Sequence, residues 1–439
     1  SFTWVRDYTL EKVRSETALH GVRDLTDTTF VVIGDDAGLV GRLESELRGR
    51  GAQVDIRTFS DGAPANAQHV VAVMPRMTDD SVTEIGLRSG IEHMYKMVPA
   101  QQSGGARTTL AVIQFTDVEL GNPAPVSSAA AFAASVHHER PELDVRVIGF
   151  DGSTADAVVA TTVVSELDSV ASYVFATYDT EMGRTALQPR VLASSDYTVR
   201  ESGLGSSDVV VVTGGAKGIM AQCALALGRK TGAELVLIGS SQRQAGDEIA
   251  STLADFTSAG LSAHYYRCNV TDAAAVAGVV AQIEVEVGPI TGFVHGAGAN
   301  VPRRFERVDS AAAFKEVAPK VLGAANFVEA LADRDLKLFV GFSSIIGFTG
   351  MPGNSWYAYG NELLDEMVMR YAAGHPKTRT FSLAYSVWGE TGMGARMGSV
   401  NHLAKMGVMP ISTAAGVDHF LRLVDSGPEA SRIVVTSRL

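Results

Sequence analysis

From Phe30 onward the chain alternates short runs of β-branched residues with amphipathic stretches. FVVI at 30–33 is followed by leucines at helical spacing, and HVVAVMP at 69–75 opens a later unit of the same plan. Near-continuous apolar strands between helical patterns are typical of βαβ units, in which helices cover both faces of a parallel sheet. The alternation therefore predicts an α/β protein built on parallel sheets.

Polar and glycine residues interrupt this pattern at 201–208, and a new apolar strand follows. On each side of the break a strand ends in glycine, three residues and a second glycine, at 34–38 and at 214–218. We therefore expect two tandem Rossmann-like, doubly wound parallel sheets, in residues 1–205 and 206–439. The alternative is a coincidental likeness, because glycine after a strand is generic turn chemistry.

Charge and composition exclude several classes of partner. The formal net charge of −12 argues against nucleic acid, whose binding depends on basic residues that displace counterions. No apolar run approaches the roughly 18 residues of a membrane helix, and the first residues show no signal-peptide pattern, so we expect a cytoplasmic protein. Cys223 and Cys268 stand outside any CxxC or Cys/His metal spacing. We expect both to be small buried hydrophobes and expect no metal.

The segment TGGAKGI at 213–219 follows a four-valine strand and precedes a helical pattern. A tight glycine turn there lets backbone N–H groups and a helix N-terminus approach a pyrophosphate. Met220 stands where the last glycine of a GxGxxG motif would be, so a plain strand-to-helix turn remains the alternative. The candidate cofactor contacts are Thr213, Gly214, Gly215, Ala216, Lys217, Gly218 and Ile219.

The next strand ends without the acidic residue that would hold an adenosine ribose, and carries Ser240, Ser241 and Arg243 instead. Hydroxyls and a guanidinium can donate to a 2′-phosphate that a carboxylate would repel, which favours NADPH. The alternative is that Arg243 is a solvated residue at a helix start. Further candidate contacts follow the third and fourth strands of this half: Asn269 and Val270 for the adenine, and His295, Gly296, Ala297 and Gly298 for the nicotinamide ribose.

A later strand ends at Ser344 and is followed by a glycine-rich loop and a helix with Tyr357 and Asn361 on one face. This stretch resembles the short-chain dehydrogenase/reductase superfamily, and specifically the ketoreductase domains of polyketide and fatty-acid synthases. In those domains a serine lies thirteen residues before the catalytic tyrosine, an asparagine four after it, and a lysine twenty-four before the serine. Ser344, Tyr357, Asn361 and Lys320 meet all three spacings.

The resemblance implies reduction of a β-ketoacyl thioester on the phosphopantetheine of an acyl carrier protein, with NADPH, beside other domains of a synthase. It also implies a truncated, cofactor-free first half that braces the catalytic half. Tyr357 would protonate the carbonyl oxygen, its pKa lowered by Lys320, while Ser344 binds that oxygen and Asn361 holds a water or the lysine in a proton relay. The structural alternatives are a core aromatic, a turn cap and an exposed helix lysine.

Candidate substrate contacts lie around the same helix and after the next strand. Trp356 is expected to form the floor of the substrate channel, with a buried core aromatic as the alternative. The Gly- and Met-rich segment 386–412 matches the position of a substrate lid, and includes Trp388 and Met393. Tyr359 is expected to point to another helix face.

Several positions depart from the family pattern. Asn269 replaces the usual aspartate, Ser240 replaces the usual basic residue, and ANVPRRFERV stands where a Leu-Asp-Asp signature is common, so no stereochemical label transfers. The turn at 213–219 is most similar to ketoreductases of iterative synthases, such as polyunsaturated-fatty-acid and enediyne types. A free alcohol dehydrogenase and a non-reducing structural or epimerising domain remain alternatives. Acyl chain length, product configuration, oligomeric state and parent synthase stay open.

Two charged segments complete the sequence predictions. Asp35 and Asp36 stand inside the first glycine turn, where two carboxylates would repel a pyrophosphate, so we expect the first half to bind no nucleotide. Arg303, Arg304 and Arg307 form a local basic patch that is expected to meet an acidic carrier protein. The alternative is a solvated segment whose arginines pair with nearby acids such as Glu306 and Asp309.

Overall fold

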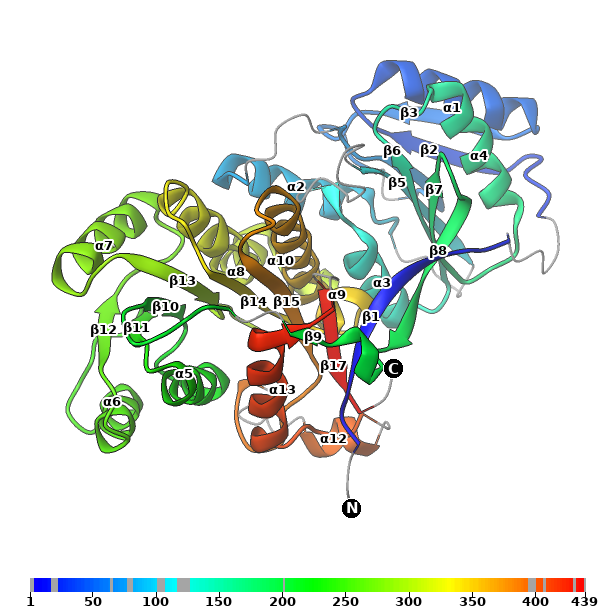
Figure 1. The fold of residues 1–439 in the computed structure, drawn as a ribbon. Coiled ribbons are helices and arrows are strands. Elements are labelled where there is room, and N and C mark those ends of the chain that lie inside the picture. Colours follow the sequence, from blue (N-terminus) through cyan, green and yellow to red (C-terminus); the bar gives the residue numbers. More distant parts are fainter. Residues whose placement is uncertain are drawn as a thin grey trace.

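The computed structural model describes residues 4–16, 23–63, 66–76, 82–100, 107–116, 127–199, 202–393, 400–405, 408–428 and 432–437. Strands and helices alternate along both halves of the chain (Figure 1), which confirms the predicted α/β class. Among the described helices, none combines the length and the apolar character that a membrane span requires.

The first half runs from the N-terminus to the segment before residue 205. Its elements are β1 (Arg6–Arg14), β2 (Thr29–Ile33), α1 (Ala37–Gly49), β3 (Gln53–Arg57), β4 (His69–Val73), α2 (Glu84–Met97), β5 (Thr108–Thr116), α3 (Ala130–Glu139), β6 (Leu143–Asp151), α4 (Asp156–Asp168), β7 (Tyr173–Asp179), β8 (Gly183–Val191), a 3-10 turn (Ser194–Asp196) and β9 (Thr198–Val199).

The second half begins at β10. Its elements are β10 (Val209–Thr213), α5 (Gly218–Thr231), β11 (Glu234–Gly239), α6 (Glu248–Ser258), β12 (Ala263–Arg267), α7 (Ala273–Glu286), β13 (Ile290–His295), a 3-10 turn (Phe305–Arg307), α8 (Ser310–Ala330), β14 (Leu338–Ser344), α9 (Ile346–Thr349), α10 (Ser355–Gly374), β15 (Arg379–Tyr385), α12 (Val400–Lys405), α13 (Thr413–Asp425), β16 (Ser426–Gly427) and β17 (Arg432–Thr436).

Each half contains a parallel doubly wound sheet, as the sequence predicts. In the second half the strand order is β12-β11-β10-β13-β14-β15-β17, and in the first half the corresponding run is β3-β2-β4-β5-β6-β7. The first half therefore has no counterpart of β12 beyond β3 in the described residues. The expected boundary between residues 205 and 206 falls in the connection between β9 and β10.

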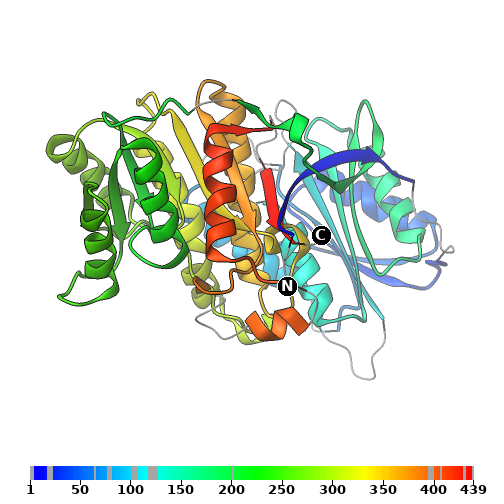
Figure 2. The ribbon, with the colours of Figure 1, turned by 60° about the horizontal axis from the view of Figure 1, so that its bottom comes forward.

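One feature of the fold was not predicted from the sequence. The sheets of the two halves are continuous. β1 pairs antiparallel with β17 on one side, with Tyr8 opposite Val434, and antiparallel with β8 on the other, with Tyr8 opposite Val191. Figure 2 shows β1 between the two halves. The described strands, apart from the short β9 and β16, thus form one sheet of fifteen.

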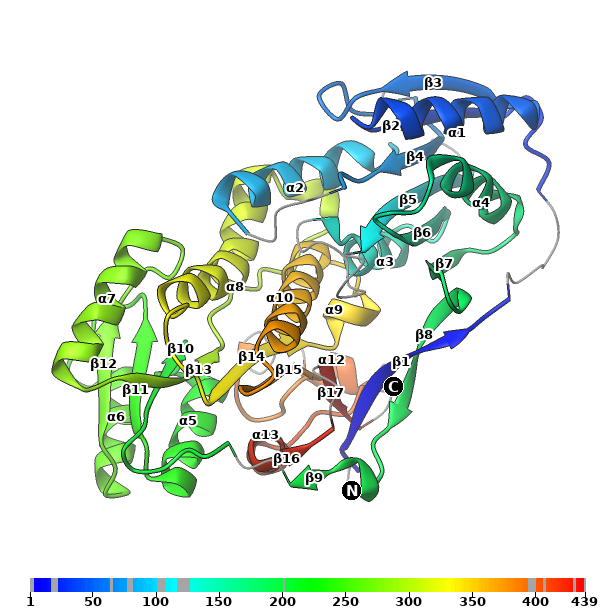
Figure 3. The ribbon, with the colours of Figure 1, turned by 45° about the horizontal axis from the view of Figure 1, so that its top comes forward.

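The halves also share a hydrophobic core on one face of this sheet. Helices α2 and α3 pack against α8 and α10 (Figure 3), and the apolar side chains from both halves form a single cluster. Trp356 lies at its centre and is 2% exposed. Its indole lies 4.8 Å from the ring of Tyr95 and 4.9 Å from that of Phe132, measured between ring centroids.

Replacement of Trp356 by alanine tests this shared core. The change removes ring packing with both halves and leaves a cavity, so we expect the free energy of unfolding to fall by about 3–5 kcal/mol. Urea titration followed by circular dichroism measures the loss. Trp4→Ala is the matched control, because Trp4 is 77% exposed and its removal should change stability by less than about 0.5 kcal/mol. Equal losses for the two variants would contradict a shared core.

Candidate active site

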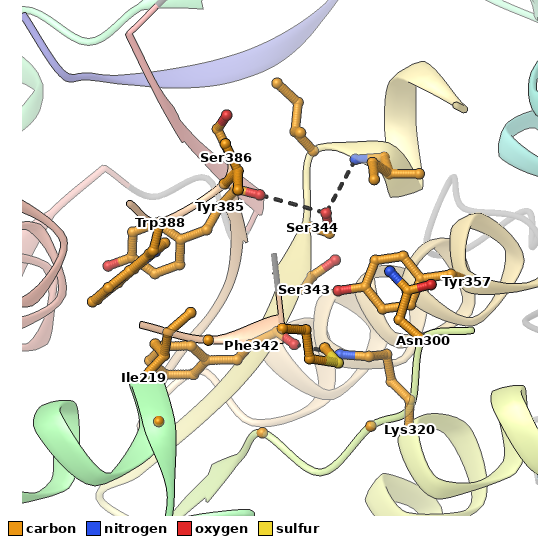
Figure 4. Close-up of a pocket in the computed structure, with 18 of the residues that line it drawn as sticks. Ile219, Asn300, Lys320, Phe342, Ser343, Ser344, Tyr357, Tyr385, Ser386 and Trp388 are labelled. Atoms are coloured by element: carbon orange, nitrogen blue, oxygen red, sulfur yellow. Dashed lines mark hydrogen bonds between the residues drawn. The ribbon is translucent and has the colours of Figure 1, made fainter. Parts of the chain in front are cut away.

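A cavity of about 620 Å³ lies at the carboxyl ends of β10, β13, β14 and β15 in the second half. Ligand sites in open α/β sheets occupy this edge, because the loops that follow the strands form a crevice there. The cavity extends from the glycine turn after β10 to the first turn of α10. Figure 4 shows the polar side chains that face one another across it.

Tyr357, Ser344 and Lys320 all line this cavity, although they come from three elements. Tyr357 stands in the first turn of α10, Ser344 ends β14 and Lys320 lies on α8. In Figure 4 the ring of Tyr357 extends toward the serines at the end of β14. The structure therefore brings three of the four predicted catalytic residues to one place.

Burial raises the pKa of Tyr357, and hydrogen bonds with Asn361 and Ser344 act in the opposite direction. The expectation that Lys320 lowers the pKa of Tyr357 is therefore wrong for this arrangement. The reason is that the Lys320 Nζ donates to the carbonyl oxygen of Phe342 at 2.7 Å, so the ammonium is directed at the backbone of β14. The phenol remains protonated at neutral pH.

Lys320 is itself buried, with 5% of its surface exposed. Burial lowers its pKa to about 8, and the charge of Asp365 opposes this fall. Glycine at 298 makes room for the side chain, since a Cβ at that position would lie 3.1 Å from the Lys320 Cε. The site thus holds a cation that gives up its proton more readily than an exposed lysine.

Asn361 does not line the cavity. Its side chain is fully buried, and its Nδ2 donates to the backbone carbonyl of Tyr357 at 2.6 Å. This bond ties Asn361 to the backbone of the preceding helical turn, which carries Tyr357. A role of Asn361 in a proton relay stays a prediction.

The predicted substrate contacts divide into two groups. Trp388 and Met393 line the cavity, whereas residues 394–399 and 406–407 of the expected lid lie outside the described residues. The prediction for Trp356 is wrong, because its helix position directs the ring into the core shared by the two halves. Tyr359 is fully buried in the same core, so it faces away from the cavity, as expected.

The glycine turn after β10 fits a bound pyrophosphate. Gly214 has a φ of +69°, and a Cβ there would lie 3.0 Å from the carbonyl oxygen of Gly296. Helix α5 begins at Gly218 without a side-chain cap, whereas Asp caps begin α6, α7 and α8. The Gly218 N–H donates to the Glu248 Oε1 at 3.2 Å, and the N–H groups that follow it in the first turn have no intrahelical partner, as an anion site requires. Of the predicted contacts, Gly214, Lys217, Gly218, Ile219, Gly296, Ala297 and Gly298 line the cavity, and Thr213, Gly215 and Ala216 do not.

His295 is fully buried behind the cavity, so the prediction that it contacts the cofactor is wrong. Its Nε2 donates to the backbone carbonyl of Lys320 at 2.9 Å, and its Nδ1 lies 2.8 Å from the Thr213 hydroxyl. Burial lowers the pKa of His295 to about 3, which keeps the ring neutral. The imidazole links β10, β13 and α8 and fixes the helix segment that carries Lys320.

The remaining cofactor candidates lie outside the cavity and stay predictions. Ser240, Ser241 and Arg243 form the surface loop after β11, while Val270 is buried. The structure adds one cation that the sequence reasoning missed, because Arg267 at the end of β12 donates to the carbonyl oxygen of Ser240 at 3.1 Å. Asn269 accepts bonds from Thr271.

Asn300 is a further cavity residue that the sequence reasoning missed. It lies beside Tyr357 and Lys320 in Figure 4 and belongs to the segment that replaces the family's Leu-Asp-Asp signature. The unusual sequence of that segment was the available signal.

An internal ion network occupies the corresponding edge of the first half. Asp36 caps α1 by accepting from the Leu39 N–H at 3.1 Å. Arg76 pairs with Asp36 at 3.4 Å and with Asp156 at 2.7 Å, and its guanidinium stacks over Phe115. The turn that would receive a pyrophosphate is thus held by protein side chains.

Residues 208–390 match the sequence profile of the KR domain. This part of the chain is similar to the KR domain family. KR domains are oxidoreductases of the short-chain dehydrogenase type and use nicotinamide cofactors.

The curated proteins that match this chain are polyketide synthases. The chain is 32% identical over 223 residues to "Phenolphthiocerol synthesis polyketide synthase type I Pks15/1" of Mycobacterium bovis, which covers 48% of this chain and 10% of the relative. It is 35% identical over 187 residues to "Polyketide synthase GfsE" of Streptomyces halstedii, covering 40% of this chain and 4% of that protein. The chain therefore corresponds to a small part of these relatives.

Solved ketoreductases share the fold of the whole chain. An N-terminal ketoreductase from the macrolactin assembly line superposes with a TM-score of 0.77 at 18% identity, covering 99% of this chain and 92% of that one. A structure described as an A1-type ketoreductase gives a TM-score of 0.78 at 20% identity, with 98% and 92% covered. The first half, which lies outside the matched profile, is thus part of a fold that these structures also have.

Proposed function

We propose that the chain reduces a β-ketoacyl thioester, carried on an acyl carrier protein, to the β-hydroxyacyl thioester with NADPH. The observation that carries this proposal is the single cavity that joins the glycine turn before α5 to Tyr357, Ser344 and Lys320. The curated relatives are polyketide synthases, and we place the chain beside other domains of such an enzyme.

The residues of the cavity have complementary roles in this reaction. NADPH, when bound, supplies the hydride to the carbonyl carbon. The phenol of Tyr357 is protonated at neutral pH and donates its proton to the carbonyl oxygen, while the Ser344 hydroxyl binds the same oxygen. Lys320 lines the same cavity, and its ammonium donates to the Phe342 carbonyl oxygen; its role in this proposal is to supply the proton that restores the phenol.

The loop after β11 supports NADPH as the cofactor. The strand ends at Gly239 and is followed by Ser240 and Ser241, with no carboxylate to repel a 2′-phosphate, and Arg243 follows on an exposed loop. The Arg267 side chain lies over the same loop through its bond to Ser240. Two guanidiniums and two hydroxyls near one phosphate position form a donor set that NADH would leave unused.

The arginine segment after β13 supports docking of an acidic carrier, although its arginines differ. Arg304 lies 3.6 Å from Glu306 and 3.9 Å from Glu139, so one of the ion pairs that the alternative expects is present. Arg303 lies 3.9 Å from Glu316. Arg307 is exposed, and we propose it as the main contact of the segment with the carrier.

Tyr357→Phe tests the proposed chemistry. The variant lacks the proton donor, so kcat for reduction of a β-ketoacyl thioester should fall at least about 100-fold, while calorimetry should give an NADPH affinity near that of the wild type. Tyr359→Phe, two residues along the helix and buried in the core, is the matched control and should keep most of the activity. A larger loss in Tyr359→Phe would contradict the assignment of the acid.

A titration with both cofactors tests the nucleotide site. We expect one equivalent of NADPH per chain, because Arg76, Asp36 and Asp156 occupy the corresponding turn of the first half. Charge-assisted hydrogen bonds should give a preference over NADH of at least about tenfold in kcat/KM. Arg243→Ala should reduce the preference, and Arg229→Ala, an exposed change at the far end of α5, should leave it unchanged. Equal kcat/KM values in the wild type would refute the proposal.

Arg307→Glu tests carrier docking. Rim charges act mainly on association rate and salt dependence, so KM for the carrier-bound substrate should rise, and rise most at low ionic strength. Reduction of a small thioester surrogate should be unaffected. Arg42→Glu makes the same charge change on an exposed position of α1 and serves as the control. A similar loss on both substrates would show that Arg307 supports folding or the cavity.

A further inference from the structure

Glu139, the last residue of α3, reaches from the first half to two segments of the second half that lie next to the cavity. Its Oε1 accepts a hydrogen bond from the Gly353 N–H at 2.8 Å, and its Oε2 accepts one from the Phe305 N–H at 2.9 Å. The side chain is 2% exposed. A single buried carboxylate thus joins two loops of the second half.

The loop before α10 lies directly on α3. The Met351 N–H donates to the Ser135 hydroxyl at 3.0 Å. Gly350 has a φ of +64°, and a Cβ there would come within 2.6 Å of the Ser135 backbone nitrogen. Only glycine permits this approach, so the loop conformation depends on the surface of the other half.

Both loops that Glu139 holds form part of the cavity. Met351, Pro352 and Asn354 line it from the loop before α10, and Pro302 lines it from the segment that leads to Phe305. Asn354 precedes α10 and stands three residues before Tyr357. A shift of the Gly353 backbone would therefore move the wall that faces the reacting carbonyl.

We propose that Glu139 is a positioning residue for the reduction, which orients the ketone before Tyr357 by holding the loops at Gly353 and Phe305. This inference rests on the proposed function, because it concerns the same cavity. Glutamate suits the position, since an ionised carboxylate has an acceptor for each N–H. A glutamine has one acceptor oxygen, and its NH₂ group would face the second N–H.

The alternative role is purely structural, in which Glu139 only stabilises the contact between the halves. The two roles differ in their effect on the product. A destabilised protein contains fewer active molecules, but each molecule still presents the same face of the ketone to the hydride. A displaced loop changes the orientation of the bound ketone, so the ratio of the two alcohol configurations changes as well.

The test compares Glu139→Gln with Glu142→Gln, the same change three residues along the chain, where the glutamate pairs with Arg140 at 3.4 Å. The substrate is a β-ketoacyl N-acetylcysteamine thioester, and the alcohols are resolved by chiral chromatography. We expect Glu139→Gln to lower kcat about tenfold, which corresponds to loss of a charge-assisted bond, and to raise the share of the minor alcohol. Glu142→Gln should match the wild type. Ser135→Ala, a milder change in the same contact, should shift the product ratio in the same direction.

Hydrogen–deuterium exchange gives a readout that does not depend on turnover. Exchange in Glu139→Gln should accelerate in peptides that contain Met351, Gly353 and Phe305, and remain at the wild-type rate in β10 and α5. An unchanged product ratio in both Glu139→Gln and Ser135→Ala, or unchanged exchange in the two loops, would overturn the proposal. A wild type that reduces no β-ketoacyl thioester would instead refute the proposed function, and the exchange data would still decide whether Glu139 holds the loops.

Discussion

The geometry of the cavity depends on the packing of α10 against α3, a helix of the other half. The first turn of α10 faces two environments, because successive residues of a helix are rotated by about 100°. Tyr357 points into the cavity, while Trp356 and Tyr359 enter the core shared with the first half. The position of the phenol is therefore fixed by the burial of its neighbours.

The two helices are joined at both ends of this contact. Glu362 of α10 accepts a hydrogen bond from the Ala131 N–H at 2.9 Å, at the start of α3, which has no side-chain cap of its own. At the other end Glu139 of α3 accepts from the loop before α10. A glutamate of each helix thus accepts from a backbone N–H at or before the start of the other helix, where no intrahelical partner exists. The first half supplies none of the described residues that line the cavity, and it can in this way determine the shape of the cavity.

The sequence predicts those features that local periodicity and spacing encode. Apolar periodicity locates the strands and helices, and the resemblance to synthase ketoreductases predicts that Ser344, Tyr357 and Lys320 lie together. The errors concern directions of side chains. Trp356 and His295 lie next to cavity residues in the chain, but packing turns both rings away from it.

Contacts between distant segments leave no periodic signal, and this limits the sequence prediction further. β1 reads as an ordinary strand, and only the assembled sheet shows that it pairs with both β8 and β17. Glu139 reads as a charged helix end, since its partners are backbone N–H groups more than 160 residues away in the chain. No residue type at those partner positions marks the contact.

Asn361 and Lys320 both stand where a glycine allows close packing. Position 361 is fully buried, and a Cβ at Gly347 of α9 would lie 2.9 Å from the Asn361 Cβ. Glycine at 347 therefore lets α9 lie close against α10 at this position, where the Asn361 amide bonds the Tyr357 carbonyl. The cation enters from α8, where the absence of a Cβ at Gly298 leaves room for the Lys320 side chain. Gly347 and Gly298 thus make the space that Asn361 on α10 and Lys320 on α8 occupy near the cavity.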